Sequence, residues 1–596
     1  MCGHPLSVHA RVPREMYASR LMPSMKHPGR TSATLPKLLP GSNPNNTCHF
    51  HVIGFVPWNP RTPVPTQLGL FFRVPPTPAP SRFGRPDSLP QSNPGRLANR
   101  ARSVPFELLK FLFPLVLLTG AATALAADTV ERWGTYEIAL RGPVTGNPFV
   151  DIHLEARFRF GNHVVDAAGF YDGDGAYRIR FMPGQTGQWT YATSSNSPAL
   201  DAKTGALTVT APSPGNHGPV RVRYATHFAY EDGSPYIPIG TTCYAWIHQG
   251  DALEKRTLET LRTAPFNKIR MCVFPKSYTY NANEPVYYPF ENRNDFTRFN
   301  PKFFQRLERR IRDLQTLGIE ADLILFHPYD RWSYSSMPPD ADDRYLRYVA
   351  ARLSAFRNVW WSLANEYDLM KSKTMADWDR FFRIVQESDR YAHLRSIHNS
   401  GPLYDHSKPW VTHVSLQSSD LEKARDYVAQ YHKPVIYDEC KYEGNIPKRW
   451  GNISAQEMVR RFWLGTVSGA YVGHGETYLD PNDILWWSKG GTLHGQSPAR
   501  IAFLRKILED APAEGLNNLS TYYLGAGQQG RYYLFYFDVN QPAEYEFDLE
   551  QGVLYRADLI DPWQMTITPI PGTFQGKFTL KLPGAPYQAV RFRRID

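Results

Sequence analysis

Hydrophobic positions recur with two different periods along the chain, and changes of period divide it into regions. From residue 127 to 223, apolar residues occupy every second position in runs such as 152–160 and 177–181, the period of a β-strand. Turn signals separate these runs, for example the DGDG sequence at 172–175. Roughly 90 residues of short strands predict an Ig-like β-sandwich.

From residue 224 to 511 strand-like and helix-like periods alternate. Predicted strands cover 236–241, 268–274, 321–326, 359–363, 395–398, 413–416, 435–437 and 470–473. Predicted helices cover 253–263, 301–318, 342–355, 375–390, 421–431, 455–468 and, after the eighth strand, 498–509. Eight strands with eight connections predict a (β/α)8 barrel. A doubly wound open sheet would also alternate, but no glycine-rich phosphate-binding turn follows any predicted strand.

Residues 512–596 return to strand-like patterns, as at 530–537 and 587–592, and predict a second small β-sandwich. The predicted fold class is therefore multidomain, with a central (β/α)8 TIM barrel flanked by an N-terminal Ig-like β-sandwich and a C-terminal β-sandwich.

The first 126 residues differ in composition from the rest. Residues 1–100 hold 18 of the 50 prolines and show no sustained period, so we expect residues 1–101 to be disordered or to reflect a start placed too far upstream. Residues 102–126 have the pattern of a secretory signal peptide, with Lys110, an apolar run at 111–118 and small residues at 124–126. A basic extension with an internal anchor is the alternative, but the run is short for a transmembrane helix. We expect a secreted or periplasmic protein without a stable membrane anchor.

Charge and cysteine content narrow the function classes. The formal net charge of +11 lies within residues 1–127, whereas the remaining residues carry 53 basic and 53 acidic side chains. A neutral body gives no reason to expect a nucleic-acid partner. Its three cysteines, Cys243, Cys272 and Cys440, show no metal-ligand spacing, and an oxidising compartment would allow one disulfide among them. We expect no metal and no cofactor.

Two carboxylates follow predicted barrel strands, at the end where barrel enzymes place their active sites. Glu366 follows the fourth strand and Glu439 the seventh, on opposite sides of the predicted barrel mouth. Glycoside hydrolysis needs two carboxyl groups flanking one bond, about 5–5.5 Å apart for retention of configuration and further apart for inversion. Asn365, beside Glu366, is predicted to bind a sugar hydroxyl. Exposed loop acids are the alternative for both glutamates.

Other polar and aromatic residues follow the predicted strands and are candidates for carbohydrate binding. These predicted substrate-binding residues are Tyr244, Trp246, His327, Tyr329, Trp332, His398, Glu443, His474, Glu476 and Trp486. Trp487 is a further candidate for ring stacking, and Arg270 for pairing with a catalytic carboxylate inside the barrel. Asp438, Glu443 and Glu476 are rivals of Glu439 for the nucleophile role.

Several of these motifs resemble known families. Asn365-Glu366 and Glu439 resemble the retaining (β/α)8 glycoside hydrolases, in which the fourth-strand glutamate is the acid/base and the seventh-strand glutamate the nucleophile. Residues 170–175 with 180–183 resemble the DUF5060 domain, and residues 326–332 with 438–444 resemble the apiosidase-like, DUF4038-type barrel. The C-terminal region is similar to DUF5605.

The resemblance implies a secreted glycoside hydrolase that cleaves a polysaccharide or oligosaccharide by double displacement. A catalytically inactive carbohydrate-binding barrel and a structural surface protein are the alternatives. Facing carboxyl groups on Glu366 and Glu439 would favour the enzyme.

Overall fold

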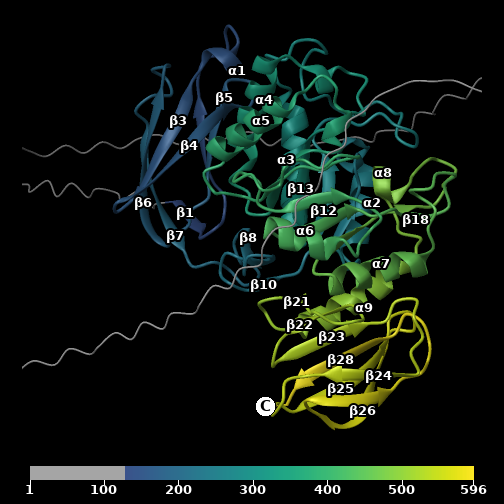
Figure 1. Ribbon diagram of the computed structural model, residues 1–596. Helices are drawn as coiled ribbons and strands as arrows, with labels where there is room; N and C mark the ends of the chain where they lie inside the picture. The colour runs from purple at the N-terminus through teal and green to yellow at the C-terminus, as the bar shows by residue number, and fades with distance from the viewer. Residues whose placement is uncertain (1–127, 596) are drawn as a thin grey trace, which may run out of the picture. The chain divides into compact units, whose positions relative to one another are not determined.

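The computed structural model describes residues 128–595 (Figure 1). The predicted signal peptide and the extension before it lie outside the described residues. Within residues 128–595 no helix is both long enough and apolar enough to cross a bilayer.

The N-terminal region is a sheet of seven strands in the order β1-β7-β6-β3-β4-β5-β2. Its elements are β1 (Asp128–Glu131), β2 (Tyr136–Arg141), α1 (Pro148–Asp151), β3 (Leu154–Phe160), β4 (His163–Tyr171), β5 (Ala176–Phe181), β6 (Gly187–Ser195) and β7 (Thr204–Thr210). Alternate residues of β3, namely Leu154, Ala156 and Phe158, are buried in one core with Trp189 of β6, and Tyr191 packs against it, which confirms the strand-like period. The Ig-like assignment of this region stays a prediction.

A small sheet precedes the barrel, formed by β8 (Val220–Arg223), β9 (His227–Tyr230) and β10 (Pro235–Tyr236). Tyr236, predicted within the first barrel strand, belongs to this sheet instead. The barrel begins only at Gly240.

Eight parallel strands form the barrel-like core, with β15 and β16 at the two ends of the hydrogen-bonded order β15-β14-β13-β12-β11-β19-β17-β16. The strands are β11 (Gly240–Thr242), β12 (Lys268–Cys272), β13 (Glu320–Phe326), β14 (Val359–Ala364), β15 (Arg395–Ser396), β16 (Val414–Gln417), β17 (Val435–Glu439) and β19 (Tyr471–His474). The Thr412 amide donates to the carbonyl of Arg395 at 2.9 Å and connects the β15 side to the β16 side. The predicted (β/α)8 core is confirmed.

Helices surround these strands (Figure 1). They are η1 (Trp246–His248), α2 (Asp251–Leu261), α3 (Pro301–Thr316), η2 (Tyr334–Ser336), α4 (Pro339–Leu353), η3 (Tyr367–Leu369), α5 (Met375–Ser388), α6 (Ala424–Tyr431), α7 (Ala455–Val467), α8 (Trp486–Lys489) and α9 (Ser497–Glu509). The connection from β15 to β16, all of it described, contains no helix. Two further short strands, β18 (Glu443–Gly444) and β20 (Glu476–Thr477), pair beyond the ends of β17 and β19.

Local sequence signals set the helix boundaries. Pro301 occupies the first turn of α3, and the Asn300 side chain accepts a hydrogen bond from the Lys302 amide at 3.2 Å. Thr374 and Asp377 form a capping box at the start of α5. These caps supply partners for amide groups that lack one within the helix.

The C-terminal region, predicted to be β-rich, contains a six-stranded sheet and a two-stranded sheet. Its strands are β21 (Asn517–Asn518), β22 (Gly525–Gln528), β23 (Tyr532–Tyr536), β24 (Glu544–Asp548), β25 (Tyr555–Asp561), β26 (Thr566–Phe574), β27 (Lys577–Lys581) and β28 (Ala589–Arg594). Phe535 and Phe592 of the larger sheet share a core with Phe547 and Leu580 of the smaller one. The β-rich prediction is confirmed.

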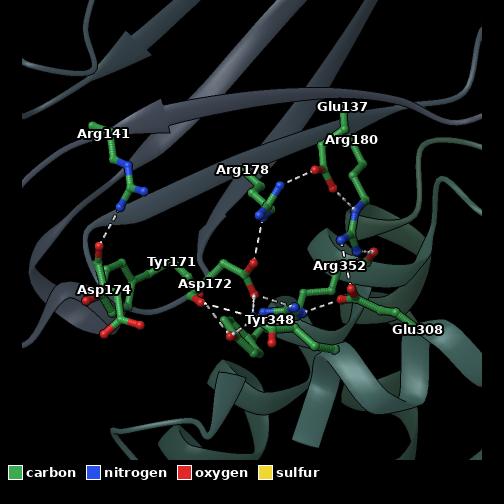
Figure 2. A network of polar contacts seen from close by, with 11 residues as sticks. Glu137, Arg141, Tyr171, Asp172, Asp174, Arg178, Arg180, Glu308, Tyr348 and Arg352 are labelled. Atoms are coloured by element: carbon green, nitrogen blue, oxygen red, sulfur yellow. Dashed lines mark hydrogen bonds and ion pairs between the residues drawn. The ribbon is translucent and has the colours of Figure 1, made fainter. Parts of the chain in front are cut away.

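A buried polar network joins the N-terminal sheet to the barrel helices (Figure 2). Arg180 of β5 donates to Glu308 of α3 at 2.8 Å, and Arg352 of α4 donates to the same carboxylate at 2.6 Å. Arg352 also donates to Asp172, which follows β4, at 2.7 Å. Because both arginines are buried with their carboxylate partners, the network fixes the sheet against the barrel.

Candidate active site

Glu366 lies just beyond β14, a fully buried strand. Its backbone has φ 50° and ψ 52°, the left-handed conformation that ordinary side chains rarely adopt. Such a conformation costs on the order of 1–3 kcal/mol and is concentrated at functional sites. Glu366 is 7% exposed, so its carboxyl group is largely removed from water.

Glu439 is the last residue of β17, and three neighbouring side chains surround its carboxylate. The Tyr244 hydroxyl donates to Oε1. Arg270 Nη1 lies 3.8 Å from the same oxygen, and His398 Nε2 lies 4.0 Å from it. Burial lowers the pKa of His398 far below its ordinary range, with the charge of Arg270 acting in the same direction, so Arg270 is the cation of this set.

Both carboxylates line one pocket of about 90 Å³. Its lining consists of Tyr244, Lys276, Tyr278, Tyr329, Asn365, Glu366, Gln417, Glu439, Tyr442, Trp450 and Trp487. A larger hollow of about 440 Å³ lies among β9, β10, β19 and the end of α9, but Glu509 is the one carboxyl residue in its lining. A second hollow of about 440 Å³ has Asp166 and Glu231 in its lining, but neither residue follows a barrel strand and each is paired with an arginine. The smaller pocket is therefore the candidate active site among the described residues, because it brings two carboxyl groups from the ends of barrel strands to one cavity.

The two carboxyl groups differ in their surroundings. Burial, followed by the negative charge of Glu439, raises the pKa of Glu366 to about 7. The Tyr329 hydroxyl donates to Glu366, and Asn365 Nδ2 lies 3.3 Å from the same oxygen. Glu439 instead has a guanidinium beside it. Glu366, whose pKa lies near neutral pH, thus shares a pocket with Glu439, whose carboxylate has the Arg270 guanidinium beside it.

A buried ion cluster lies below the pocket. Lys268 donates to Asp322 at 2.7 Å and to Asp438 at 2.8 Å, and all three side chains are at most 1% exposed. The Ser415 hydroxyl also donates to Asp438, at 2.5 Å. Asp438, considered as a rival nucleophile, is therefore engaged by Lys268 and Ser415 and does not line the pocket.

Six of the predicted site residues meet in the pocket, and the others do not. Glu366, Glu439, Asn365, Tyr244, Tyr329 and Trp487 line it. Outside the lining are Trp246, His327, Trp332, His398, Glu443, His474, Glu476 and Trp486, and each of these is at most 2% exposed.

Trp246, Trp332 and Trp486 donate hydrogen bonds to partners that do not line the pocket. The Nε1 atoms of Trp246, Trp332 and Trp486 lie 3.0 Å from Met271 Sδ, 2.9 Å from Glu284 Oε2 and 2.8 Å from Thr241 Oγ1, respectively. His327 Nε2 lies 3.1 Å from the carbonyl oxygen of Phe274, a residue of the β12–α3 connection. The structure gives these side chains packing roles, because burial and internal partners keep them from the pocket.

Glu443, His474 and Glu476 approach within 4.8 Å of one another, and among residues 128–595 they could hold a metal ion. However, each Glu443 oxygen already accepts two hydrogen bonds, from Tyr478 and Gln496 on one side and from the Ser497 amide and hydroxyl on the other. With its acceptor sites filled in this way, Glu443 anchors the segment before α9.

Glu476 anchors the same segment by accepting from the amides of His494 at 2.6 Å and Gly495 at 2.8 Å. Burial raises the pKa of Glu476 to about 7, with the charge of Glu443 adding to the effect. The rival nucleophile and substrate-binding roles predicted for Glu443 and Glu476 therefore have no support in their placement, since both carboxylates face the protein interior.

Sequence reasoning missed several pocket residues, among them Lys276, Tyr278, Gln417, Tyr442 and Trp450. Lys276, Tyr278 and Tyr442 carry the same signal as the residues it found, a polar or aromatic side chain shortly after a barrel strand, and Gln417 ends a strand. Trp450 lies beyond β18, and no such signal marks it. Trp487 lines the pocket whereas its neighbour Trp486 is buried in the barrel, a distinction that a pair of adjacent tryptophans does not reveal.

Comparisons with known proteins agree with this geometry. Family models match residues 223–511 as an apiosidase-like catalytic domain, residues 129–196 as DUF5060 and residues 522–593 as DUF5605. Both DUF5060 and DUF5605 are domains of unknown function. A crystal structure from Bacteroides vulgatus ATCC 8482, provisionally described as a glycoside hydrolase, is 40% identical, with a TM-score of 0.75 over 78% of this chain and 100% of that one.

More distant structures share the fold alone. A glycoside hydrolase family 5 protein from Bacteroides vulgatus ATCC 8482 is 15% identical, with a TM-score of 0.52 over 64% of this chain and 95% of that one. Another structure, described as a glycoside hydrolase, is 15% identical, with a TM-score of 0.51 over 64% and 98% of the two chains. No curated protein matches the sequence significantly.

Proposed function

Since the chain belongs to the apiosidase-like family of glycoside hydrolases, we propose that it hydrolyses O-glycosidic bonds of a polysaccharide or oligosaccharide by a retaining double displacement. The observation that carries the proposal is the pocket in which Glu366 and Glu439 meet in unlike surroundings. One carboxyl has a pKa of about 7, and the other has an arginine and a tyrosine hydroxyl beside it. Two carboxyl groups that differ in this way suit an acid and a nucleophile.

In the first step Glu439 attacks the anomeric carbon and its oxygen forms the new bond. The glycosidic bond breaks, and Glu366 gives its proton to the departing oxygen. In the second step Glu366, now ionised, takes a proton from water, whose oxygen displaces Glu439 and releases the sugar. Both carboxyl groups return to their starting states, so the reaction needs no outside donor of protons or electrons.

The remaining pocket residues suit a neutral, ring-shaped substrate. Tyr278, Trp450 and Trp487 lie near one another, with ring centroids 6.1 Å apart for Tyr278 and Trp487 and 4.9 Å for Trp450 and Trp487. Aromatic faces of this kind can stack on sugar rings, while Asn365 and Gln417 supply amide groups for hydroxyls.

A screen of plant and bacterial polysaccharides tests the proposal. New reducing ends should appear with the wild-type protein and disappear with Glu439→Ala, which serves as the matched blank. If the protein binds one of these polysaccharides without cleaving it, the chain is a carbohydrate-binding barrel and the proposed reaction is wrong.

We also propose export of the protein, supported by the basic-flanked apolar run and small-residue site at 102–126. N-terminal sequencing of the exported protein should give Ala127 as the first residue. A mature chain that begins further upstream would contradict cleavage at this site.

A further inference from the structure

Lys276 follows β12, and its side chain ends in the pocket with Glu366 and Glu439. The residue is 4% exposed. Within residues 128–595, no carboxylate forms an ion pair with its ammonium group and no side chain or carbonyl accepts a hydrogen bond from it. The side chain is largely buried and only its end reaches the pocket, so the placement of an ammonium without such a partner beside two carboxyl groups calls for an explanation.

Two tyrosine rings hold the ammonium group of Lys276. Its Nζ lies 3.7 Å from the ring centroid of Tyr244 and 4.3 Å from that of Tyr329. Cations are attracted to such ring faces. The hydroxyls of the same two tyrosines donate to Glu439 and Glu366, respectively. The lysine thus lies between the two side chains that hold the catalytic carboxyl groups.

The charges beneath the pocket do not balance without this lysine. Lys268 and Arg270 supply two positive charges. Asp322, Asp438 and Glu439 supply three negative charges, and every one of these carboxylates lies within 4.0 Å of Lys268 or Arg270. The cluster therefore carries one excess negative charge in a region with little access to water, where an uncompensated charge is expensive.

Lys276 supplies the missing positive charge. When it is included and Glu366 is protonated, three positive charges face the three negative charges of Asp322, Asp438 and Glu439, and the group is neutral. Burial lowers the pKa of Lys276, but the charges of Glu366 and Glu439 oppose this effect. If the ammonium were absent, the excess negative charge would make the carboxyl pair hold its shared proton to higher pH, and Glu366 would be less able to act as a base in the second step.

We propose that Lys276 is a positioning residue whose ammonium group, held between Tyr244 and Tyr329, offsets the excess negative charge of the pocket, so that the Glu366 and Glu439 pair can both hold and release its shared proton near neutral pH. The role of Lys276 in hydrolysis rests on the proposed function. Its effect on the charge of the pocket does not depend on that function.

Other groups face the pair from the elements packed around it. They are Arg270 of β12, Tyr244 after β11, Tyr329 after β13, Asp368 of η3, His398 after β15 and Tyr442 after β17. Burial raises the pKa values of the three tyrosines and lowers that of His398, so these four groups are uncharged near neutral pH. Lys276 and Arg270 are then the cations that act on the pair, and Asp368 opposes them.

Infrared difference titration tests the proposal without a substrate. The absorption band of protonated carboxyl groups is recorded from pH 4 to 10. For each variant, the spectrum of the same chain with Glu366→Gln added is subtracted, so that the difference follows the Glu366 carboxyl. The wild-type midpoint should lie near 7. In Lys276→Met the midpoint should rise by about one pH unit, since the loss of a neighbouring positive charge raises the pKa of a carboxyl group by about that amount. Lys276→Arg, which keeps the charge, should restore most of the wild-type midpoint.

Lys408→Met is the matched control, because the ammonium of Lys408 also lies over aromatic rings, 4.8 Å from Tyr404 and 5.6 Å from Trp410. Its loss should leave the Glu366 midpoint unchanged. If Lys276→Met does not fold, as judged by its thermal melt, Lys276→Gln takes its place as a polar neutral variant.

An unchanged midpoint in a folded, uncharged variant, or an equal rise in Lys276→Arg, would overturn the proposal. A rise confined to the uncharged variants would support it even if the polysaccharide screen found no activity. The titration can therefore contradict the role of Lys276 while the screen supports hydrolysis, and the reverse.

Discussion

Replacement of Arg352 by Met should weaken the attachment of the N-terminal sheet to the barrel. Arg352 is fully buried and donates to Glu308 at 2.6 Å and to Asp172 at 2.7 Å (Figure 2). Methionine fills part of the space but cannot pair with either carboxylate. Glu308 keeps Arg180 as a second partner, so the network is weakened and not abolished.

The size of the effect follows from the pKa of Glu308. Burial alone would raise it, but the charges of Arg352 and Arg180 hold it at about 2, compared with an ordinary value of 4.5. A difference of that size corresponds to about 3 kcal/mol of stability, in line with ~3–5 kcal/mol for breaking a buried pair. Because Arg180 remains, we expect Arg352→Met to lose about 2 kcal/mol.

The dependence on pH has a definite sign. Since the pKa of Glu308 is lowered in the folded state, its stabilisation is present above pH 4.5 and is lost as the pH falls towards 2. Urea unfolding followed by tryptophan fluorescence should show a lower midpoint for Arg352→Met than for wild type at pH 7, with a smaller difference at pH 3. Arg157→Met, which breaks an exposed pair with Asp166, is the control and should match wild type.

Equal midpoints for wild type and Arg352→Met at pH 7 would refute the reasoning, as would a difference that is the same at pH 7 and pH 3. The first result would mean that the network contributes nothing to stability. The second would mean that the lost stability comes from packing and not from charge.

Two further predictions concern the site and its supporting loop. Hydrolysis should decline on the alkaline side with a midpoint near pH 7, as Glu366 loses its proton, and kcat/KM measured from pH 4 to 10 would contradict this if it stayed flat. In Gly495→Ala the new Cβ would lie 2.5 Å from Glu443 Oε2 and 2.6 Å from Glu476 Oε2, so the thermal midpoint should fall by an amount that corresponds to about 1–3 kcal/mol. Gly184→Ala, where nothing lies within 4 Å of the new Cβ, should melt like wild type. Equal melting of both variants would contradict the anchoring of the segment before α9 by Glu443 and Glu476.

The barrel could be predicted because its strands are buried on both sides and appear as short apolar runs between helical periods. The residues of β14, for example, are all buried. The beginning of the first strand could not be placed in this way, since Tyr236 lies in an apolar run but pairs with β9. Only three-dimensional pairing separates that short sheet from the barrel.

The meeting of two carboxyl groups in the pocket could be predicted because the end of a barrel strand fixes where the next residue lies. This rule holds for Glu366 and Glu439, which meet in the pocket. It fails for Glu443 and Glu476, because pairing of β18 with β20 places them where the segment before α9 covers their carboxylates. The role of Lys276 depends on which charges surround it, and these come from strands far apart in the sequence.

The roles of Glu366 and Glu439 are tested most directly by the products formed when azide is added to the two alanine variants. The substrate is an activated aryl glycoside of the sugar found in the screen. Glu439→Ala lacks the nucleophile, so azide should attack in its place and give a glycosyl azide of inverted configuration. Glu366→Ala still forms the glycosyl-enzyme, and azide should intercept it and give the retained product. Near-normal activity of both variants on a natural substrate would contradict the account, and exchanged stereochemistry would reverse the two assigned roles.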